Sequence, residues 1–231
     1  MKITLKDGSV KEYAQAMSVI DIAKDLSEGL ARAACAGEVD GEVVDLRTVL
    51  DKDCELNILT ARDEKGLAVL RHTASHVMAE AVQTLFPEAK VAIGPSIDTG
   101  FYYDFECQSF SRDDLDAIEK EMKKIIKKGA KIERFTKSRE DAIAFFKEKN
   151  EPYKVELIED LPEGEEISFY SQGDWVDLCA GPHLMSTKGI KAFKLLSSSG
   201  AYWRGDEHNK MLTRLYATAF AKKEELEAYI T

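Results

Sequence analysis

The residues best suited to proton transfer or metal binding stand in two short pairs in this 231-residue sequence. His72 and His76 are four positions apart within VLRHTASHVMAEAVQ, residues 69–83, whose apolar side chains recur at helical spacing. Because four residues make about one helical turn, we expect both imidazoles on one helix face. Cys179 and His183 form a second pair, also four apart. The two pairs hold three of the four histidines, and we expect them to converge on one site.

The two pairs need different supporting elements. Gly181 and Pro182 lie between Cys179 and His183, and this dipeptide disfavours an uninterrupted helix. We therefore expect the second pair on a turn that follows a strand, facing the helix that carries the first pair. A rigid helix opposed by a tight turn would fix four side chains around a pocket.

Three chemistries fit such a quartet, and the spacing does not choose among them. Three imidazoles and one thiolate form a tetrahedral zinc set with no position left for water, which would favour a structural metal. Without metal, a histidine could take a proton from water while Lys154, the Cys179 thiol or backbone N–H groups stabilise an oxyanion during ester hydrolysis. Cys179 could instead be a covalent nucleophile. The plainest alternative is a set of ordinary half-buried polar residues.

The composition is that of a soluble globular protein, with 44% hydrophobic and 32% charged residues. No apolar run approaches 18 residues, so we expect no membrane span, and the first ten residues lack a signal-peptide core. We therefore expect a cytoplasmic location. A net charge of −10 argues against binding nucleic acid mainly by phosphate neutralisation. The four cysteines form no C-x-x-C pair, which excludes a thiolate zinc ribbon and a disulfide framework.

Residues 1–61 predict a ubiquitin-like β-grasp domain in the element order ββαβββ. A hairpin is expected first, then a helix with Ser18 as its N-cap that ends near Gly29. Three further strands are expected at 33–39, 43–46 and 55–60. The segment contains no histidine, so binding is a more plausible role for it than catalysis. The charged residues 61–66 mark the domain boundary.

Residues 62–231 predict a larger α+β domain with an antiparallel sheet and packed helices. The expected helices cover residues 69–83, 111 to about 131, 138–149 and 221–230. The expected strands cover residues 90–93, 101–105, 131–135, 152–158, 167–170, 175–178, 191–197 and 211–220. Lysines between residues 120 and 131 indicate a solvated helix face or, alternatively, an edge that contacts phosphates.

Four segments, in order, resemble the N-terminal half of a bacterial threonyl-tRNA synthetase: RHTASHVMAEAVQTLFPEAKVAIGPSIDTGFYYDF, EPYKVELI, DLCAGPHL and GAYWRGDEHNKMLTRLYATAF. The resemblance covers the whole chain. It implies a TGS domain over residues 1–61 and an editing domain, with its "second additional" subdomain, over residues 62–231. The H-x-x-x-H and C-x-x-x-H pairs are shared with alanyl-tRNA editing proteins, whereas GAYWRGD behind a TGS-like module is typical of the threonyl family.

The resemblance implies hydrolysis of the ester in seryl-tRNA(Thr), with the 3′ end of that tRNA as partner. It also implies a site built from residues of two kinds: catalytic residues His72, His76, Lys154, Cys179 and His183, and substrate-binding residues Asp177 and Tyr103. His72 would handle the proton of water, and Lys154 would be the positive partner of the ester or terminal ribose. Alanyl relatives hold zinc with the shared quartet, whereas the threonyl family works without it, so no cofactor is required although zinc could bind.

The resemblance further implies that the aminoacylation core and the anticodon-binding domain lie outside these residues. We therefore expect no aminoacylation by this chain alone, and a monomer, since the family dimerises through that core. Two alternatives remain at this point. One is a non-catalytic tRNA-docking module with a structural zinc site, and the other is a metal-dependent hydrolase of small esters.

Overall fold

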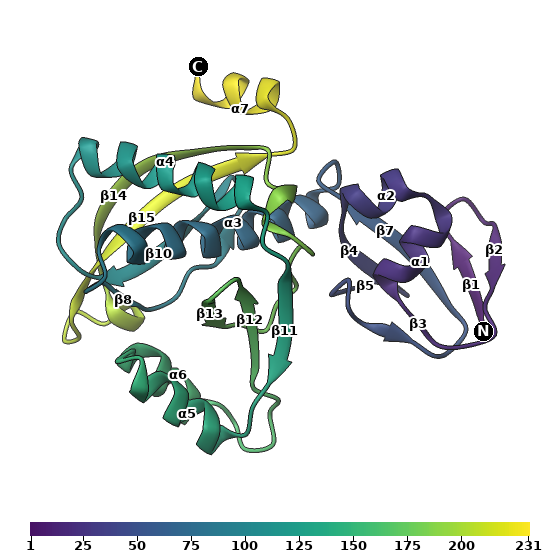
Figure 1. Cartoon of the computed structure of the whole chain (residues 1–231), viewed down its shortest axis with the longest axis horizontal. Helices are drawn as coiled ribbons and strands as arrows, with labels where there is room; N and C mark the ends of the chain where they lie inside the picture. The colour runs from purple at the N-terminus through teal and green to yellow at the C-terminus, as the bar shows by residue number, and fades with distance from the viewer. The chain divides into compact units, whose positions relative to one another are not determined.

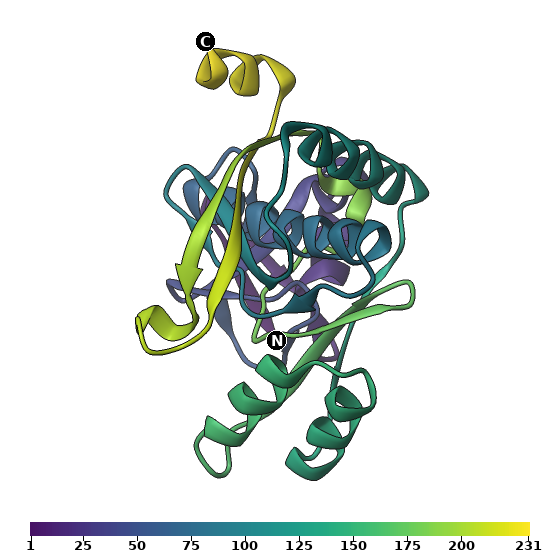
Figure 2. The same ribbon diagram turned by 90° about the vertical axis from the view of Figure 1, so that its left-hand side faces the viewer.

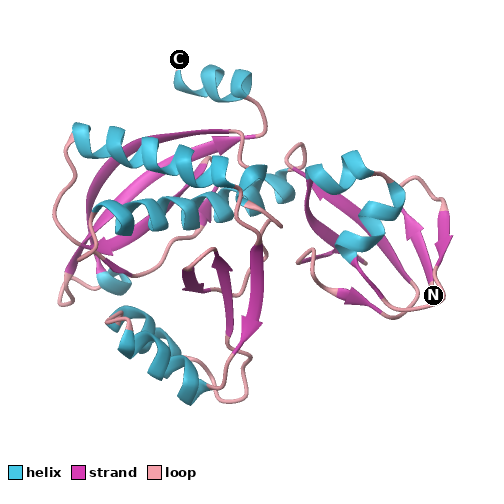
Figure 3. Cartoon of the chain, in the orientation of Figure 1, coloured by secondary structure: helices cyan, strands magenta, loops and turns pink.

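The computed structural model describes residues Met1–Thr231 and divides into two compact units. The first unit comprises Met1–Leu70 with Gly181–Met185, and the second comprises Arg71–Ala180 with Ser186–Thr231. Helices and strands are mixed in both units (Figure 3), as the predicted α+β class requires. None of the helices combines the length and the apolar character needed to cross a membrane.

The first unit is a five-stranded sheet of order β2-β1-β7-β4-β5 with two short helices (Figure 1). The first strand pairs antiparallel with the second and parallel with the seventh, which confirms the predicted β-grasp fold. The strands are β1 (Lys2–Leu5), β2 (Val10–Glu12), β4 (Ala34–Val39), β5 (Glu42–Val44) and β7 (Cys54–Thr60), beside a small pair, β3 (Met17–Ser18) and β6 (Val49–Leu50).

The helical part of the first unit differs from the prediction at its end. Helix α1 (Val19–Leu26) begins at the expected N-cap, since the Ser18 side chain accepts a hydrogen bond from the Asp21 N–H. It does not continue to Gly29, because Ser27 is extended and caps a second helix, α2 (Glu28–Ala33). The predicted helix end near Gly29 was therefore wrong: a second capping serine restarts the helix.

The second unit is built on an antiparallel sheet of order β14-β15-β10-β8, with β9 paired to β10. Its strands are β8 (Lys90–Val91), β9 (Ser96–Ile97), β10 (Gly100–Glu106), β14 (Ala192–Tyr202) and β15 (Met211–Phe220). Helices α3 (Glu64–Leu85) and α4 (Arg112–Lys128) run along the same side of this sheet in both views (Figures 1 and 2). Helix α4 begins at the predicted Ser111, which forms a reciprocal capping box with Asp114.

A smaller layer of the second unit consists of a three-stranded sheet and a helical pair. The strands are β11 (Ile132–Thr136), β12 (Ser168–Gln172) and β13 (Trp175–Leu178), and the helices are α5 (Arg139–Glu148) and α6 (Pro152–Asp160). Figure 2 shows the two helices side by side. The remaining elements are the 3-10 turns η1 (Thr187–Gly189) and η2 (Trp203–Gly205) and the last helix, α7 (Lys223–Ile230).

Helix α6 corrects the predicted strand over residues 152–158. The alternation of Tyr153, Val155 and Leu157 is typical of a strand, but Pro152 stands at the first helical turn, a position that suits proline. Both sides of this short helix are covered. Val155 packs into the core shared with α5, whereas Tyr153 and Leu157 pack into the cluster around Trp203. Tertiary packing on two sides therefore outweighs the local strand preference.

Candidate active site

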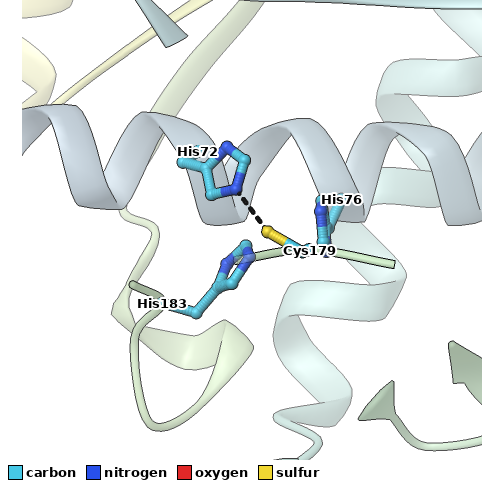
Figure 4. Close-up of side chains that lie close together, drawn as sticks. All are labelled: His72, His76, Cys179 and His183. Atoms are coloured by element: carbon cyan, nitrogen blue, oxygen red, sulfur yellow. Dashed lines mark hydrogen bonds between the residues drawn. The ribbon is translucent and has the colours of Figure 1, made fainter. Parts of the chain in front are cut away.

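The two predicted histidines lie on consecutive turns of α3, and the cysteine reaches them from the end of β13 (Figure 4). The ring centroids of His72 and His76 are 5.2 Å apart. The Nε2 atom of His72 lies 2.8 Å from the Sγ atom of Cys179, the residue that directly follows β13. Residues 107 positions apart in the sequence therefore meet within hydrogen-bonding distance in the second unit.

Asp177, two residues before the cysteine, is the centre of a buried charged group. Lys154 Nζ lies 2.7 Å from its Oδ1 atom, the Tyr103 hydroxyl donates a 2.6 Å hydrogen bond to Oδ2, and His76 Nε2 lies 3.3 Å from Oδ2. The four residues are each no more than 3% exposed. The Asp177 charge is thus compensated by Lys154 rather than by solvent, although its Oδ1 atom has an ion-pair partner and no hydrogen bond of good geometry.

Burial sets the protonation states of these groups. It lowers the pKa of His72 to about 4 and that of His76 to about 3, against which the attraction of Asp177 is too weak. Burial alone would raise the pKa of Asp177, but Lys154, His76 and the Tyr103 hydroxyl together lower it. The pKa of Tyr103 is raised by burial and by the Asp177 charge. At neutral pH the site therefore holds two neutral imidazoles beside an ionised carboxylate.

These residues border a pocket of about 240 Å³. Its polar wall comprises His72, His76, Tyr103, Lys154, Asp177 and Cys179, and its apolar wall comprises Ile93, Gly94, Pro95, Leu157 and Leu178. A Cβ atom at Gly94 would lie 2.2 Å from Tyr103 Cδ2, so glycine is what allows this loop to close over the tyrosine ring. His72 and Cys179 are half-buried, whereas His76, Tyr103, Lys154 and Asp177 are buried.

A polar chain behind the pocket fixes the His76 ring, and the sequence did not reveal it. The ring packs edge-on to Trp175, with centroids 5.4 Å apart. The Trp175 indole N–H donates to Gln83, and the Gln83 amide donates to Glu151. The only sequence signals were a tryptophan two residues before Asp177, whose N–H needs a partner when buried, and a glutamine two turns after His76 on the same helix.

His183, the fourth predicted member, lies on the Gly181–Met185 segment that is grouped with the first unit. There its backbone N–H donates to Asp45 Oδ2 at 3.1 Å, and Arg47 donates to the carbonyls of His183 and Leu184. Figure 4 draws its side chain with those of His72, His76 and Cys179, and the ligand atoms that the four residues offer lie within 4.8 Å of one another.

The donor set suits zinc in its chemistry. Imidazole nitrogen and thiolate sulfur are the ligand atoms that zinc prefers, and His72, His76 and Cys179 of the second unit offer three of them. The low pKa of His72 and His76 favours this, because only a neutral imidazole coordinates metal. A bound zinc ion would either stabilise this part of the fold or polarise a carbonyl group.

Two family models match the chain. The TGS domain matches residues 1–60, and the "Threonyl and Alanyl tRNA synthetase second additional domain" matches residues 167–216, which include Asp177, Cys179 and His183. Residues 1–60 are therefore similar to a TGS domain, and residues 167–216 are similar to the second additional domain of these synthetases. The predicted boundary between residues 61 and 62 remains a prediction, since the division into compact units falls later, within α3.

Curated relatives specify the kind of synthetase. The chain is 62% identical to the threonine–tRNA ligase of Acetivibrio thermocellus, 60% identical to that of Clostridium botulinum and 58% identical to that of Clostridium novyi. Each match covers 100% of this chain and 36% of the relative, so the chain spans about a third of the length of these ligases. Over its whole length the chain is similar to the N-terminal part of bacterial threonine–tRNA ligases.

Proposed function

We propose that the pocket of the second unit hydrolyses the ester bond of seryl-tRNA(Thr), as an editing site. The observation that carries this proposal is the convergence of His72, Cys179 and Lys154 on one pocket in a chain similar to threonine–tRNA ligases. The pocket, at about 240 Å³, is smaller than the usual range for ligand pockets. It suits an aminoacyl group whose nucleotide remains outside.

The proposed reaction is attack of water on the ester carbonyl. His72 takes one proton from the water, and the new carbon–oxygen bond places negative charge on the former carbonyl oxygen. The Lys154 ammonium stabilises this oxyanion. The intermediate then collapses: the bond from carbon to the ribose oxygen breaks, and that oxygen receives the proton held by His72. The products are serine and a tRNA with a free terminal hydroxyl.

His76, Asp177 and Tyr103 have supporting roles in this scheme. Asp177 holds the Lys154 ammonium at the pocket wall, and the Tyr103 hydroxyl in turn fixes one carboxylate oxygen. His76 stays neutral between Asp177 and the His72 ring, so it adds no positive charge that would make His72 a weaker base. Cys179, hydrogen-bonded to His72, would orient the imidazole ring.

Selectivity follows from the one methyl group by which threonine exceeds serine. Binding distinguishes one methylene by only about 1–3 kcal/mol, which explains why an activating site that accepts threonine also accepts serine. A second, smaller pocket that excludes the extra methyl would remove the error. We expect the apolar wall formed by Ile93, Pro95 and Leu157 to provide that exclusion.

The decisive experiment is a deacylation assay with the full chain on seryl-tRNA(Thr) and threonyl-tRNA(Thr). We expect hydrolysis of the seryl ester only. His72→Ala should lower kcat by at least about a hundredfold, since a general base contributes 10²–10⁴-fold, with the fold retained. His208→Ala is the matched control, because His208 is exposed and contacts only Asp206 among charged groups. Equal hydrolysis by wild type and His72→Ala would contradict the proposal.

The proximity of the four metal-binding side chains favours one other function, a tRNA-docking module with a structural zinc site. In that case the purified chain would contain one zinc ion, and a chelator would lower its melting temperature. The wild-type chain would not hydrolyse the seryl ester, and His72→Ala would unfold the protein. Metal content and melting temperature, measured on the same samples as the deacylation assay, separate the two functions.

The proposed setting is that of the relatives. The tRNA(Thr) acceptor end is the proposed partner, and the remaining domains of the ligase would supply aminoacylation. A cytoplasmic location is also proposed, because tRNA is charged and used for protein synthesis in the cytoplasm.

A further inference from the structure

Helix α6 brings Lys154 to the pocket, and it packs against α5 on one side and against the Trp203 cluster on the other. It is nine residues long, and its N-cap residue, Glu151, makes no side-chain capping hydrogen bond. Lys154 and Leu157, three apart and therefore on one face, both border the pocket. Small movements of α6 would move both groups, so the contacts that hold its outer side bear directly on the pocket.

The η2 turn between β14 and β15 grips the outer part of α6. The Trp203 indole N–H donates a 2.7 Å hydrogen bond to Glu156 Oε2, and its ring meets Tyr153 edge-on at 4.9 Å. The Arg204 guanidinium forms a 2.5 Å ion pair with Asp160 Oδ2 and lies 4.0 Å from Glu156 Oε1. Two adjacent residues of one turn thus contact three successive levels of the helix.

The backbone of this turn is held in a costly conformation. Arg204 has φ +58°, one of only three non-glycine residues in the chain with positive φ. A non-glycine residue in this region costs of order 1 kcal/mol and persists where its surroundings require it. Two hydrogen bonds hold the backbone of Trp203. Its backbone N–H donates to the Lys210 carbonyl, and its carbonyl accepts from the Asn209 side chain. In this backbone conformation the Arg204 side chain reaches Glu156 and Asp160 of α6.

We infer that Trp203 and Arg204 are positioning residues, which clamp α6 so that Lys154 stays in contact with Asp177 at the pocket wall. This assigns a role to the WRG segment, residues 203–205. The expected effect on catalysis rests on the proposed function, whereas the effect on the position of Lys154 does not. The mechanical link runs from Trp203 through Tyr153 and Leu157, all members of one core cluster, to the lysine between them in the sequence. The clamp itself touches neither the pocket nor the reacting atoms.

The test combines activity with a chemical probe of Lys154. Lys154 is 2% exposed, so acetic anhydride labelling, followed by peptide mass spectrometry, should modify it slowly in the wild-type chain. Arg204→Gly removes the clamp and also relieves the positive φ, so the fold should keep its melting temperature. Trp203→Phe keeps the aromatic packing but loses the indole N–H. We expect both variants to label Lys154 several-fold faster and to lower kcat about tenfold with little change in KM, because a displacement below 1 Å suffices for such losses.

Two further variants make the outcome specific. Arg204→Asp combined with Asp160→Arg should restore slow labelling and kcat, whereas each single change should not. Asp40→Gly is the matched control: it relieves a positive φ of 49° in the first unit and should alter neither readout. Unchanged labelling in Arg204→Gly and Trp203→Phe would overturn the inference. If the wild-type chain hydrolyses no seryl ester, the proposed function fails, while the labelling still decides whether the clamp positions Lys154.

Discussion

Two lysine–carboxylate pairs of equal length, one in each unit, show how differently the two units are built. Lys65 and Glu38 in the first unit lie 2.7 Å apart with side chains 58% and 21% exposed. Lys154 and Asp177 in the second unit also lie 2.7 Å apart, but their side chains are 3% and 2% exposed. The first pair is a solvated surface contact, whereas the second is shielded from solvent. Only the second pair therefore loses much stability when one partner is removed.

The same contrast holds across the two units. The core of the first unit is a cluster of aliphatic residues around Ile3, Val19 and Leu56, and its one buried polar side chain is that of His183, in the Gly181–Met185 segment. The second unit buries His76, Lys154, Asp177 and several other polar side chains. An apolar core stabilises a fold without further conditions, whereas buried charges must be paired in exact geometry. The buried polar groups of the second unit therefore cost stability that an apolar core would not. Three predictions test this difference between the units.

The largest effect is expected from removing one charge of the buried pair. Lys154→Met leaves the Asp177 carboxylate without its strongest partner and should lower the free energy of unfolding by about 3–5 kcal/mol. Urea unfolding followed by tryptophan fluorescence is the measurement, because Trp175 and Trp203 both lie in the second unit. Lys65→Met, the matched change in the first unit, should leave the urea midpoint unchanged.

A double variant separates stability from function at this pair. Lys154→Met combined with Asp177→Asn leaves no unpaired charge, so stability should return to within about 1 kcal/mol of wild type while seryl-ester hydrolysis stays absent. If Lys154→Met alone proved as stable as wild type, the buried pair would not be the demanding feature that its geometry indicates.

The sequence predicted the parts of this site that depend on local spacing. One helical turn separates His72 from His76, and Gly181-Pro182 disfavours a continuous helix after Cys179, so a helix and a turn were expected as supports. That the two segments meet across 107 residues was an expectation that only the structure could test. The N-caps Ser18 and Ser111 were also predicted correctly, because an N-cap serine bonds only to the first turn of the helix that follows it.

What the sequence did not predict depends on partners far along the chain. The strand predicted over residues 152–158 is helix α6, since packing against α5 on one side and Trp203 on the other outweighs local preference. The chain of contacts from Glu151 through Gln83 to Trp175 joins three separate elements, and nothing in any one of them specifies the other two. Buried polar networks are properties of the assembled fold.

Lowering the pH should weaken the second unit by an intermediate amount. The folded-state pKa values of His72 and His76, about 4 and about 3, lie below the ordinary value of 6.5. Between these limits the unfolded chain binds protons that the folded chain does not, so stability is complete above about pH 6.5 and falls as the pH decreases. From pH 7.5 to 5.5 the two histidines should together remove about 3 kcal/mol. The lowered pKa of Asp177 acts only at lower pH.

Fluorescence-detected urea unfolding at the two pH values, with a chelator present, measures this loss. Residues 1–70 contain no histidine, so hydrogen-exchange protection within them should change little over the same range. A variant with both His72→Gln and His76→Gln should flatten the pH dependence of the second unit. An equally steep dependence in that variant would assign the effect to other groups.

The smallest effect compares a glycine of the pocket with a glycine of a turn. Gly94→Ala places a Cβ atom 2.2 Å from Tyr103 Cδ2 and 2.7 Å from the Tyr102 carbonyl oxygen, so either the loop or the tyrosine ring must move. Overpacking of this kind costs about 1–3 kcal/mol, and because the ring carries the hydroxyl that binds Asp177, hydrolysis of the seryl ester should fall as well. Gly8→Ala, in the first unit, meets no atom within 4 Å and opposes only a φ of +88°. It should lower stability by about 1 kcal/mol and leave hydrolysis unchanged. Since both substitutions add the same methyl group, a loss of hydrolysis confined to Gly94→Ala would place the functional constraint in the pocket wall, whereas equal retention of activity would show that the loop can yield without disturbing Tyr103.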